Sequence, residues 1–304
     1  METEQAHSLV THPLAVDGRE AALRRPRMAQ RAVPVVWLNL VCLDAPLVSV
    51  AWLGLFARVF HVTISPANGA ALFLTAWLIY LADRLADSYS LPALGPRSLR
   101  HGFCLNHRQV WIGALAVIAA ADGVLIWRGI SHETFVAGAV IGALALTYLV
   151  LNYSLGGAWP ALPLKEPAIG LLFAAGTLVA LFPAFPAVSG SLVCAGVAFA
   201  VLCALNCISI AFWERALDET QRKVSVATRY PWLAPHLGKF PIALALCCGL
   251  SGFVFRNAAL IFGCASLSAL LLALLDFLRG RVARDQRTSL ADLVLLTPLL
   301  AMLV

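Results

Sequence analysis

Two short segments carry the same arrangement of charged residues, each directly after an apolar run. In the first, DRLAD, Asp83 and Asp87 stand four residues apart; in the second, ERALD, Glu214 and Asp218 have the same spacing. Residues four apart lie on one face of a helix, so each segment presents two carboxylates together where a hydrophobic helix meets water. Mg²⁺ takes carboxylates, waters and phosphate oxygens together. We therefore predict the four acids as metal ligands and Mg²⁺ as the cofactor.

Basic residues near these acids suit a phosphate-bearing substrate. A diphosphate needs a divalent metal for charge neutralisation and Lys or Arg around the leaving group. Lys165 stands alone just before an apolar run, and we group it with the four acids as a catalytic candidate. Arg84, Arg222 and Lys223 are candidate phosphate ligands. For one such segment, ordinary interfacial charges remain the competing interpretation; two matching segments on one side weaken it.

The composition places the chain in a membrane. Apolar residues make up 61% of the 304 residues, charged residues only 12%, and the mean hydropathy is +0.83. A soluble protein carries roughly twice that share of charge. We expect an all-α, polytopic membrane domain over 34–304, with about nine transmembrane helices. The apolar runs lie near 34–57, 68–82, 110–127, 134–152, 167–184, 190–213, 240–255, 258–278 and 289–304.

The distribution of basic residues predicts the orientation. Residues 1–33 contain five arginines and no apolar periodicity, so we expect a disordered, basic, cytoplasmic tail. With nine spans, only Arg58, Arg128 and Arg256 of the 22 Lys and Arg fall outside. Both acidic segments then face the cytoplasm. The expected location is a bacterial inner (plasma) membrane, crossed several times, with the active face cytoplasmic.

Polar residues within the apolar runs are further candidates for the site. Asp44 lies in the first run, where a carboxylate is expensive and is usually functional or paired. A hydrogen-bonded packing role beside Pro46 is the alternative. Asn206 is two helical turns deeper than Glu214, either lining a pocket beneath the metal or bonding to another helix. We assign both residues to substrate binding.

Other polar residues are expected to be structural. Asp122 should be interfacial, and Asp276 and Asp292 should balance nearby arginines. His101 and His107 fall in a long connection and should be solvated. The eight cysteines form no CxxC pair and are interpreted as packing residues.

In the order and placement of these motifs, the sequence resembles the UbiA superfamily of intramembrane prenyltransferases. That family has nine helices and acidic motifs after helices two and six, where DRLAD and ERALD stand here. Leu43-Asp44-Ala45-Pro46 matches a Leu-Asp-x-Pro element of its first helix, and Lys165 matches a lysine before helix five. Ile79 and Tyr80 occupy places where the family usually has Asn and Asp. Glu214 replaces the usual aspartate.

The resemblance implies Mg²⁺-dependent transfer of an isoprenyl group from a prenyl diphosphate to an aromatic or lipid acceptor within the membrane. Asp83, Asp87, Glu214 and Asp218 would hold the metal, while basic residues steady the diphosphate. The expected partners are a prenyl diphosphate, a membrane-soluble acceptor and the lipid bilayer, with no nucleic acid. Residues that would line the apolar substrate site are Trp77, Tyr80, Phe212 and Trp213.

Two other functions stay open at this point. A catalytically silent relative would keep the fold without the chemistry, and the residues at positions 79 and 80 favour it. A transporter would use acids inside the membrane, such as Asp44 and Asp122. A transporter should depend on Asp44 and be indifferent to Glu214, whereas a transferase should depend on both acid pairs.

Overall fold

The computed structural model describes residues 34–90, 96–154, 165–184, 189–221 and 223–303. The predicted tail, 1–33, and Arg222 lie outside the described residues. Within the described ranges every regular element is a helix. The all-α class is therefore confirmed.

Six helical segments are long and apolar enough to cross a membrane, and a bent pair would make a seventh. The bent pair is α2 (Pro34–Leu40) and α3 (Asp44–Val59), which meet at 92°. The chain is thus a polytopic helical membrane protein by length and composition, and nine spans stays a prediction. The six segments are α4 (Pro66–Tyr89), α6 (Arg108–Gly129), α7 (His132–Ser154), α8 with η2 (Lys165–Leu178, Val179–Ala184), α9 (Gly190–Thr220) and η4 with α12 (Arg256–Ala258, Ala259–Phe277).

The first apolar run is broken where a single helix over 34–57 was expected. Cys42 adopts a left-handed backbone with φ of 58°, a conformation that ends a helix. Asp44 then begins α3, and its Oδ1 accepts a hydrogen bond from the Ala45 amide at 3.0 Å. A carboxylate is favourable at a helix N-terminus because free N–H groups point towards it. Asp44 therefore starts a helix rather than lying in the middle of one.

The last part of the chain is also divided. α13 (Arg284–Leu293) passes into η5 (Val294–Leu296) and α14 (Thr297–Met302). Pro298 stands in the first turn of α14, where its missing N–H is tolerated, whereas inside a continuous helix it would break the ladder. The single span predicted over 289–304 is therefore a broken helix. Before it, α11 (Lys239–Val254) is apolar and has 16 residues.

The long helix α9 is central to the packing. It contacts α8, α11, α12 and α13, and its Phe199 stacks on Trp52 of α3 with 4.4 Å between ring centroids. By contrast, α6 and α7 expose large apolar side chains, among them Val117, Trp127 and Leu146. Such surfaces are stable against lipid rather than water. The packing of α9 against these helices therefore fixes the position of its C-terminal end, which carries Glu214 and Asp218.

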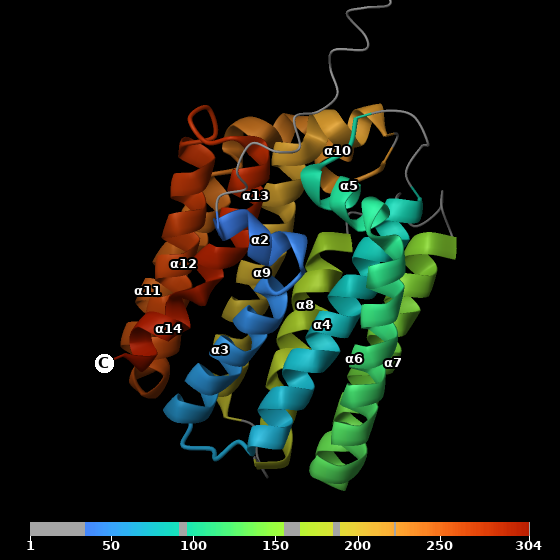
Figure 1. The fold of residues 1–304 in the computed structure, drawn as a ribbon. Coiled ribbons are helices and arrows are strands. Elements are labelled where there is room, and N and C mark those ends of the chain that lie inside the picture. The colour runs from blue at the N-terminus through green and yellow to red at the C-terminus, as the bar shows by residue number, and fades with distance from the viewer. Residues whose placement is uncertain (1–33, 91–95, 155–164, 185–188, 222, 304) are drawn as a thin grey trace, which may run out of the picture. The chain divides into compact units, whose positions relative to one another are not determined.

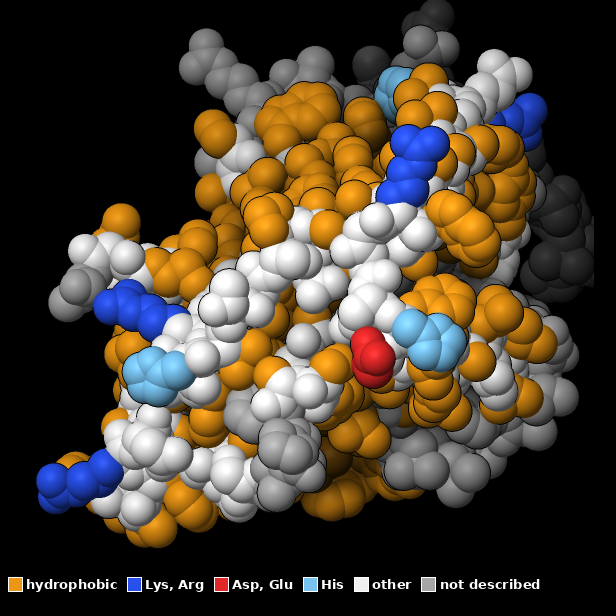
Figure 2. Space-filling model, turned by 90° about the horizontal axis from the view of Figure 1, so that it is seen from below, with side chains coloured by type: hydrophobic (Ala, Val, Ile, Leu, Met, Phe, Trp, Pro, Cys, Tyr) orange, Lys and Arg blue, Asp and Glu red, His pale blue; other side chains and the backbone are white. Residues whose placement is uncertain are grey.

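Short helices lie across one end of the bundle (Figure 1). They are α5 (Leu99–Asn106), α10 (Val226–Arg229) and η3 (Pro231–His236), which follow the two acidic segments. Viewed from the opposite end, the surface bears few charged side chains among many apolar ones (Figure 2). The ionisable groups of interest therefore belong to the α5 end.

Candidate functional site

Both acid pairs lie inside helices. α4 continues through Asp83 and Asp87 to Tyr89, and α9 continues through Glu214 and Asp218 to Thr220. The apolar runs predicted from the sequence stop before these acids, but the helices do not. The expected placement of each pair on one helical face is thereby confirmed.

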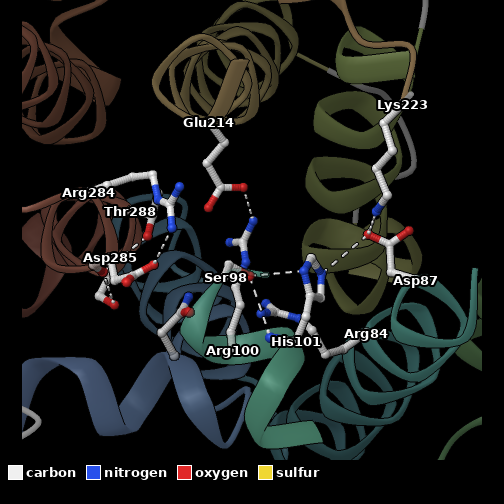
Figure 3. Close-up of polar contacts among 12 residues, drawn as sticks. Arg84, Asp87, Ser98, Arg100, His101, Glu214, Lys223, Arg284, Asp285 and Thr288 are labelled. Atoms are coloured by element: carbon white, nitrogen blue, oxygen red, sulfur yellow. Dashed lines mark hydrogen bonds and ion pairs between the residues drawn. The ribbon is translucent and has the colours of Figure 1, made fainter. Parts of the chain in front are cut away.

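Helix α5 lies between the two acid pairs and reaches both of them (Figure 3). Arg100 donates a hydrogen bond from Nη2 to Oε2 of Glu214 on α9, and both side chains are largely buried. His101, the next residue, places its Nε2 3.7 Å from Oδ2 of Asp87 on α4. Two neighbouring residues of α5 thus connect the ends of α4 and α9.

His101 is held in place from its other side. Its Nδ1 lies 2.9 Å from Oγ of Ser98, the residue that caps α5. Burial lowers the pKa of His101 to about 4. The nearby Arg100 charge also lowers this pKa, whereas the bond to Asp87 raises it. The imidazole is therefore neutral near pH 7. The prediction that His101 is solvated was wrong, since only 5% of it is exposed, whereas His107 is exposed as predicted.

Two lysines join the same end of the bundle. Lys223 places Nζ 3.2 Å from Oδ2 of Asp87 (Figure 3). Lys165, the first residue of α8, is close enough for its charge to act on both Asp87 and Asp218. Asp218 lies near Glu214, one helical turn before it on α9. The structure therefore brings together the two acid pairs and both predicted lysines.

Arg84 is buried beside His101 and bonds to a tyrosine rather than to an acid (Figure 3). Only 4% of it is exposed, and Nη2 donates to the Tyr80 hydroxyl at 2.8 Å while the guanidinium lies 5.0 Å from the ring centroid. Among the described residues, no carboxylate comes within ion-pair distance of Arg84, and its Nη1 has no hydrogen-bond partner. A buried cation with an unused donor is suited to accept an anion.

A deeper polar cluster contains the remaining predicted residues. Asn39 donates from Nδ2 to Asp44 Oδ2 at 2.6 Å and to Asp292 Oδ2 at 3.1 Å. Asn206 donates to Asp292 Oδ1 at 2.8 Å, so the interhelical bond expected for Asn206 is present. Asp292 was predicted to balance arginines, which is wrong: it bonds to amides of α2 and α9. No residue near Asp292 in the sequence indicates these amide partners, because Asn39 and Asn206 come from distant segments.

Of the two remaining aspartates, Asp122 differs from its prediction, whereas Asp276 lies near an arginine, Arg287, as predicted. Asp122 is 4% exposed and accepts a hydrogen bond from Thr75 at 2.7 Å, so it is buried between α4 and α6 rather than interfacial. Asp276 accepts a bond from the Trp213 indole at 2.9 Å, and Arg287 lies over that ring. This contact fixes Trp213, the neighbour of Glu214, against α12 and α13.

The acids do not form a complete metal cage. Within the described ranges, no group of three or more His, Cys, Asp or Glu side chains is placed to hold a metal ion. Mg²⁺, however, is commonly bound by one or two carboxylates together with substrate phosphates and water. Glu214 Oε1 is buried and has no hydrogen-bond partner, as such a shared site requires. The residues thus fit a magnesium ion held partly by a phosphate substrate.

Several residues of the site were missed from the sequence. Arg100 and His101 lie in a connection between apolar runs, and only Ser98 followed by Leu99 and Phe103 indicates a capped helix there. Glu166 is 4% exposed and accepts a bond from the Val226 amide at 3.3 Å, which ties α8 to α10.

No family model, curated protein or solved structure matches the chain. The function of the protein is therefore inferred from the geometry of the α5 end.

Proposed function

We propose that this protein is a membrane-embedded prenyltransferase that uses Mg²⁺ to transfer an isoprenyl group from a prenyl diphosphate to an aromatic or lipid acceptor. The observation that supports this most strongly is the meeting of two acid pairs with buried cations at one end of an apolar bundle. There, Glu214 Oε1 lacks a donor and Arg84 Nη1 lacks an acceptor. A metal ion would be bound by Glu214 Oε1, and a phosphate oxygen would accept a hydrogen bond from Arg84 Nη1.

The acidic residues of the site would hold the metal, and the basic residues would bind the diphosphate. Asp83, Asp87, Glu214 and Asp218 would hold Mg²⁺, which supplies charge neutralisation to the leaving diphosphate. Lys165, Lys223 and Arg84 would bind phosphate oxygens, and Arg222, which lies outside the described residues, would join them. In the absence of metal, Arg100 is the counter-ion of Glu214. If Mg²⁺ took the place of Arg100 beside Glu214, the guanidinium would be free to bind the phosphate. The isoprenyl tail would lie among apolar helices near Trp77 and Tyr80.

The proposal includes the finer topology. Nine spans would result if α2–α3, α11 and α13–α14 each count as one, with the α5 end cytoplasmic. The family resemblance and the positions of the basic residues support this orientation. A bacterial inner membrane is the proposed location.

The test is equilibrium binding of farnesyl and geranylgeranyl diphosphate to the detergent-purified protein, with Mg²⁺ and with EDTA. Asp83→Asn and Glu214→Gln should each lose metal-dependent binding. Glu219→Gln is the matched control, because Glu219 is on the same helix but half exposed and paired with Arg215. Binding that is absent in the folded parent, or unchanged in both acid variants, contradicts the proposal.

A catalytically silent relative is the second candidate. The engagement of Glu214 by Arg100 and of Asp87 by Lys223 favours it, because these cations stand where a metal would act. It predicts a folded protein that binds neither diphosphate under any metal condition. The same binding experiment therefore distinguishes the two.

A further inference from the structure

Four polar side chains from four helices meet in the interior, deeper than the acid pairs. They are Asn39 of α2, Asp44 of α3, Asn206 of α9 and Asp292 of α13. Asn39, Asp44 and Asn206 are 3%, 1% and 5% exposed, while Asp292 keeps part of its surface accessible. The cluster is therefore buried but can be reached beside Asp292.

The contacts of this cluster favour one proton shared by the two carboxyl groups. One amide nitrogen, Nδ2 of Asn39, donates to an oxygen of each aspartate, so the two carboxyl groups lie side by side around a single donor. A proton shared between them would leave one negative charge in place of two. In the described residues neither aspartate has Lys or Arg within ion-pair distance. Two buried like charges without cations strongly repel.

One atom of the cluster has no partner. Asn206 uses its Nδ2 on Asp292, but its Oδ1 is buried without a hydrogen-bond donor. An unsatisfied buried acceptor is destabilising, so it marks a place where a ligand's donor would be bound. The titratable and charged groups that face the pair from neighbouring elements are Cys42, Tyr80, Arg84, Arg100, Cys203 and Cys207.

We propose that Asp44 and Asp292 form a carboxyl pair with one shared proton, which binds a hydroxyl-bearing, uncharged aromatic acceptor and takes up the proton that this acceptor loses. The proposal rests on the proposed prenyltransferase function and names its acceptor class. A carboxylate in the position of the acceptor's hydroxyl would meet Asn206 Oδ1 and the two carboxyl groups and be repelled, since neither Arg84 nor Arg100 is within ion-pair distance of Asp44 or Asp292. A phenol instead donates its hydroxyl to Asn206 Oδ1.

The step balances without an additional reactant. The allylic C–O bond breaks, and its electron pair leaves on the diphosphate. A ring carbon of the phenol donates a π pair to form the new C–C bond. The C–H electrons restore the aromatic ring, and the ring proton passes to the carboxylate of the pair. The pair then returns this proton to solvent when the products leave.

The shared proton is tested first, without reference to activity. Infrared spectra of the protein in lipid at pH 7 should contain the carbonyl band of a protonated carboxylic acid, which shifts in D₂O. The band should be lost from both Asp44→Asn and Asp292→Asn and kept in Asp122→Asn, a buried aspartate bonded to Thr75 instead. A parent spectrum without a protonated carboxyl band overturns the pair, and this result needs no variant to fold.

The acceptor role is tested with matched probes, 4-propylphenol and 4-propylbenzoate, and the prenyl diphosphate that the parent binds. The parent should prenylate the phenol but not the benzoate. Asp292→Asn should bind the diphosphate within about twofold of the parent and prenylate the phenol at least about 100-fold more slowly, the usual range for a lost general base. Undiminished transfer by Asp292→Asn, or preference for the benzoate, overturns the inference.

The two proposals fail in different ways. If the parent binds no diphosphate, the prenyltransferase proposal fails and the acceptor role fails with it, while the infrared band still reports on the proton pair. If diphosphate binding is normal and the phenol is not prenylated, only the acceptor class is wrong.

Discussion

The two acidic segments are one pattern in the sequence and two different structures in the protein. In α4, the arginine of DRLAD is buried: Arg84 is 4% exposed and bonds to Tyr80. In α9, the arginine of ERALD faces outward, and Arg215 pairs with Glu219 on the surface. In ERALD the first acid is the buried charged group instead, since Glu214 is 6% exposed.

The difference follows from which face of each helix is packed. On α4 the buried positions near the motif are Leu81, Arg84 and Ser88, whereas on α9 they are Trp213, Glu214 and Leu217. Because a helix turns 100° per residue, a shift of one position relative to the core exchanges an inward acid for an inward arginine. The two motifs therefore place opposite charges in the interior, and under the proposed function the acid would serve the metal and the arginine the phosphate.

The largest effect is expected at the inward acid. Glu214→Ala should lower the free energy of unfolding by about 3 kcal/mol, because it leaves the Arg100 guanidinium buried without its partner. Glu219→Ala on the outer face should cost less than about 0.5 kcal/mol, since it removes only an exposed i,i+4 pair. Reversible unfolding in mixed micelles measures both.

The double variant Glu214→Ala/Arg100→Ala sharpens this result. Removing both charges should cost clearly less than the sum of the two single changes, because no uncompensated charge remains. Strict additivity would mean that the contact contributes nothing and that α5 is held by other interactions.

The next effect concerns the inward arginine. Arg84→Met should weaken prenyl diphosphate binding by at least about 30-fold, or about 2 kcal/mol, if the guanidinium holds a phosphate. Its stability should be kept or raised, because the guanidinium has no carboxylate partner among the described residues and methionine fills a similar volume. Arg215→Met is the control and should change binding by less than twofold. Isothermal titration with Mg²⁺ measures both, and equal losses would show that the two arginines are equivalent after all.

Much of the fold could be predicted from the apolar runs, but the site could be predicted only in part. The runs over 110–127 and 190–213 correspond to α6 and α9, because long apolar stretches have few alternatives to a spanning helix. The break at Cys42 could not be predicted, since a left-handed residue other than glycine leaves no compositional sign. The i,i+4 spacing identified the acids, but their partners Arg100 and Asp292 come from distant segments, and tertiary packing alone decides which face is inward.

A third prediction uses the contact between α5 and α4. Folded His101 remains neutral down to about pH 4, whereas an unfolded histidine takes up a proton near pH 6.5. The unfolded state therefore binds more protons between these values, and stability should fall as the pH decreases from about 6.5 to about 4. The loss should be on the order of 1–2 kcal/mol by pH 5. His101→Gln should show a flatter profile over this window than the parent, while exposed His107→Gln should not; parallel profiles for all three would contradict a buried neutral His101.

The smallest effect is expected from magnesium alone, and it tests whether the opposed motifs need a substrate to bind metal. With no group of three donor side chains among the described residues, Mg²⁺ should bind weakly by itself, adding about 0.4 kcal/mol of stability when its concentration equals its Kd. A diphosphate added with Mg²⁺ should stabilise the protein more than the two measured separately, because phosphate oxygens complete the coordination and reach Arg84. Thermal unfolding with Mg²⁺, with diphosphate and EDTA, and with both measures this coupling, and Ca²⁺ serves as a control of similar charge and larger size. Strong stabilisation by Mg²⁺ alone would instead mean that the two acid pairs already form a closed metal site, and the inward acid and inward arginine would then act independently.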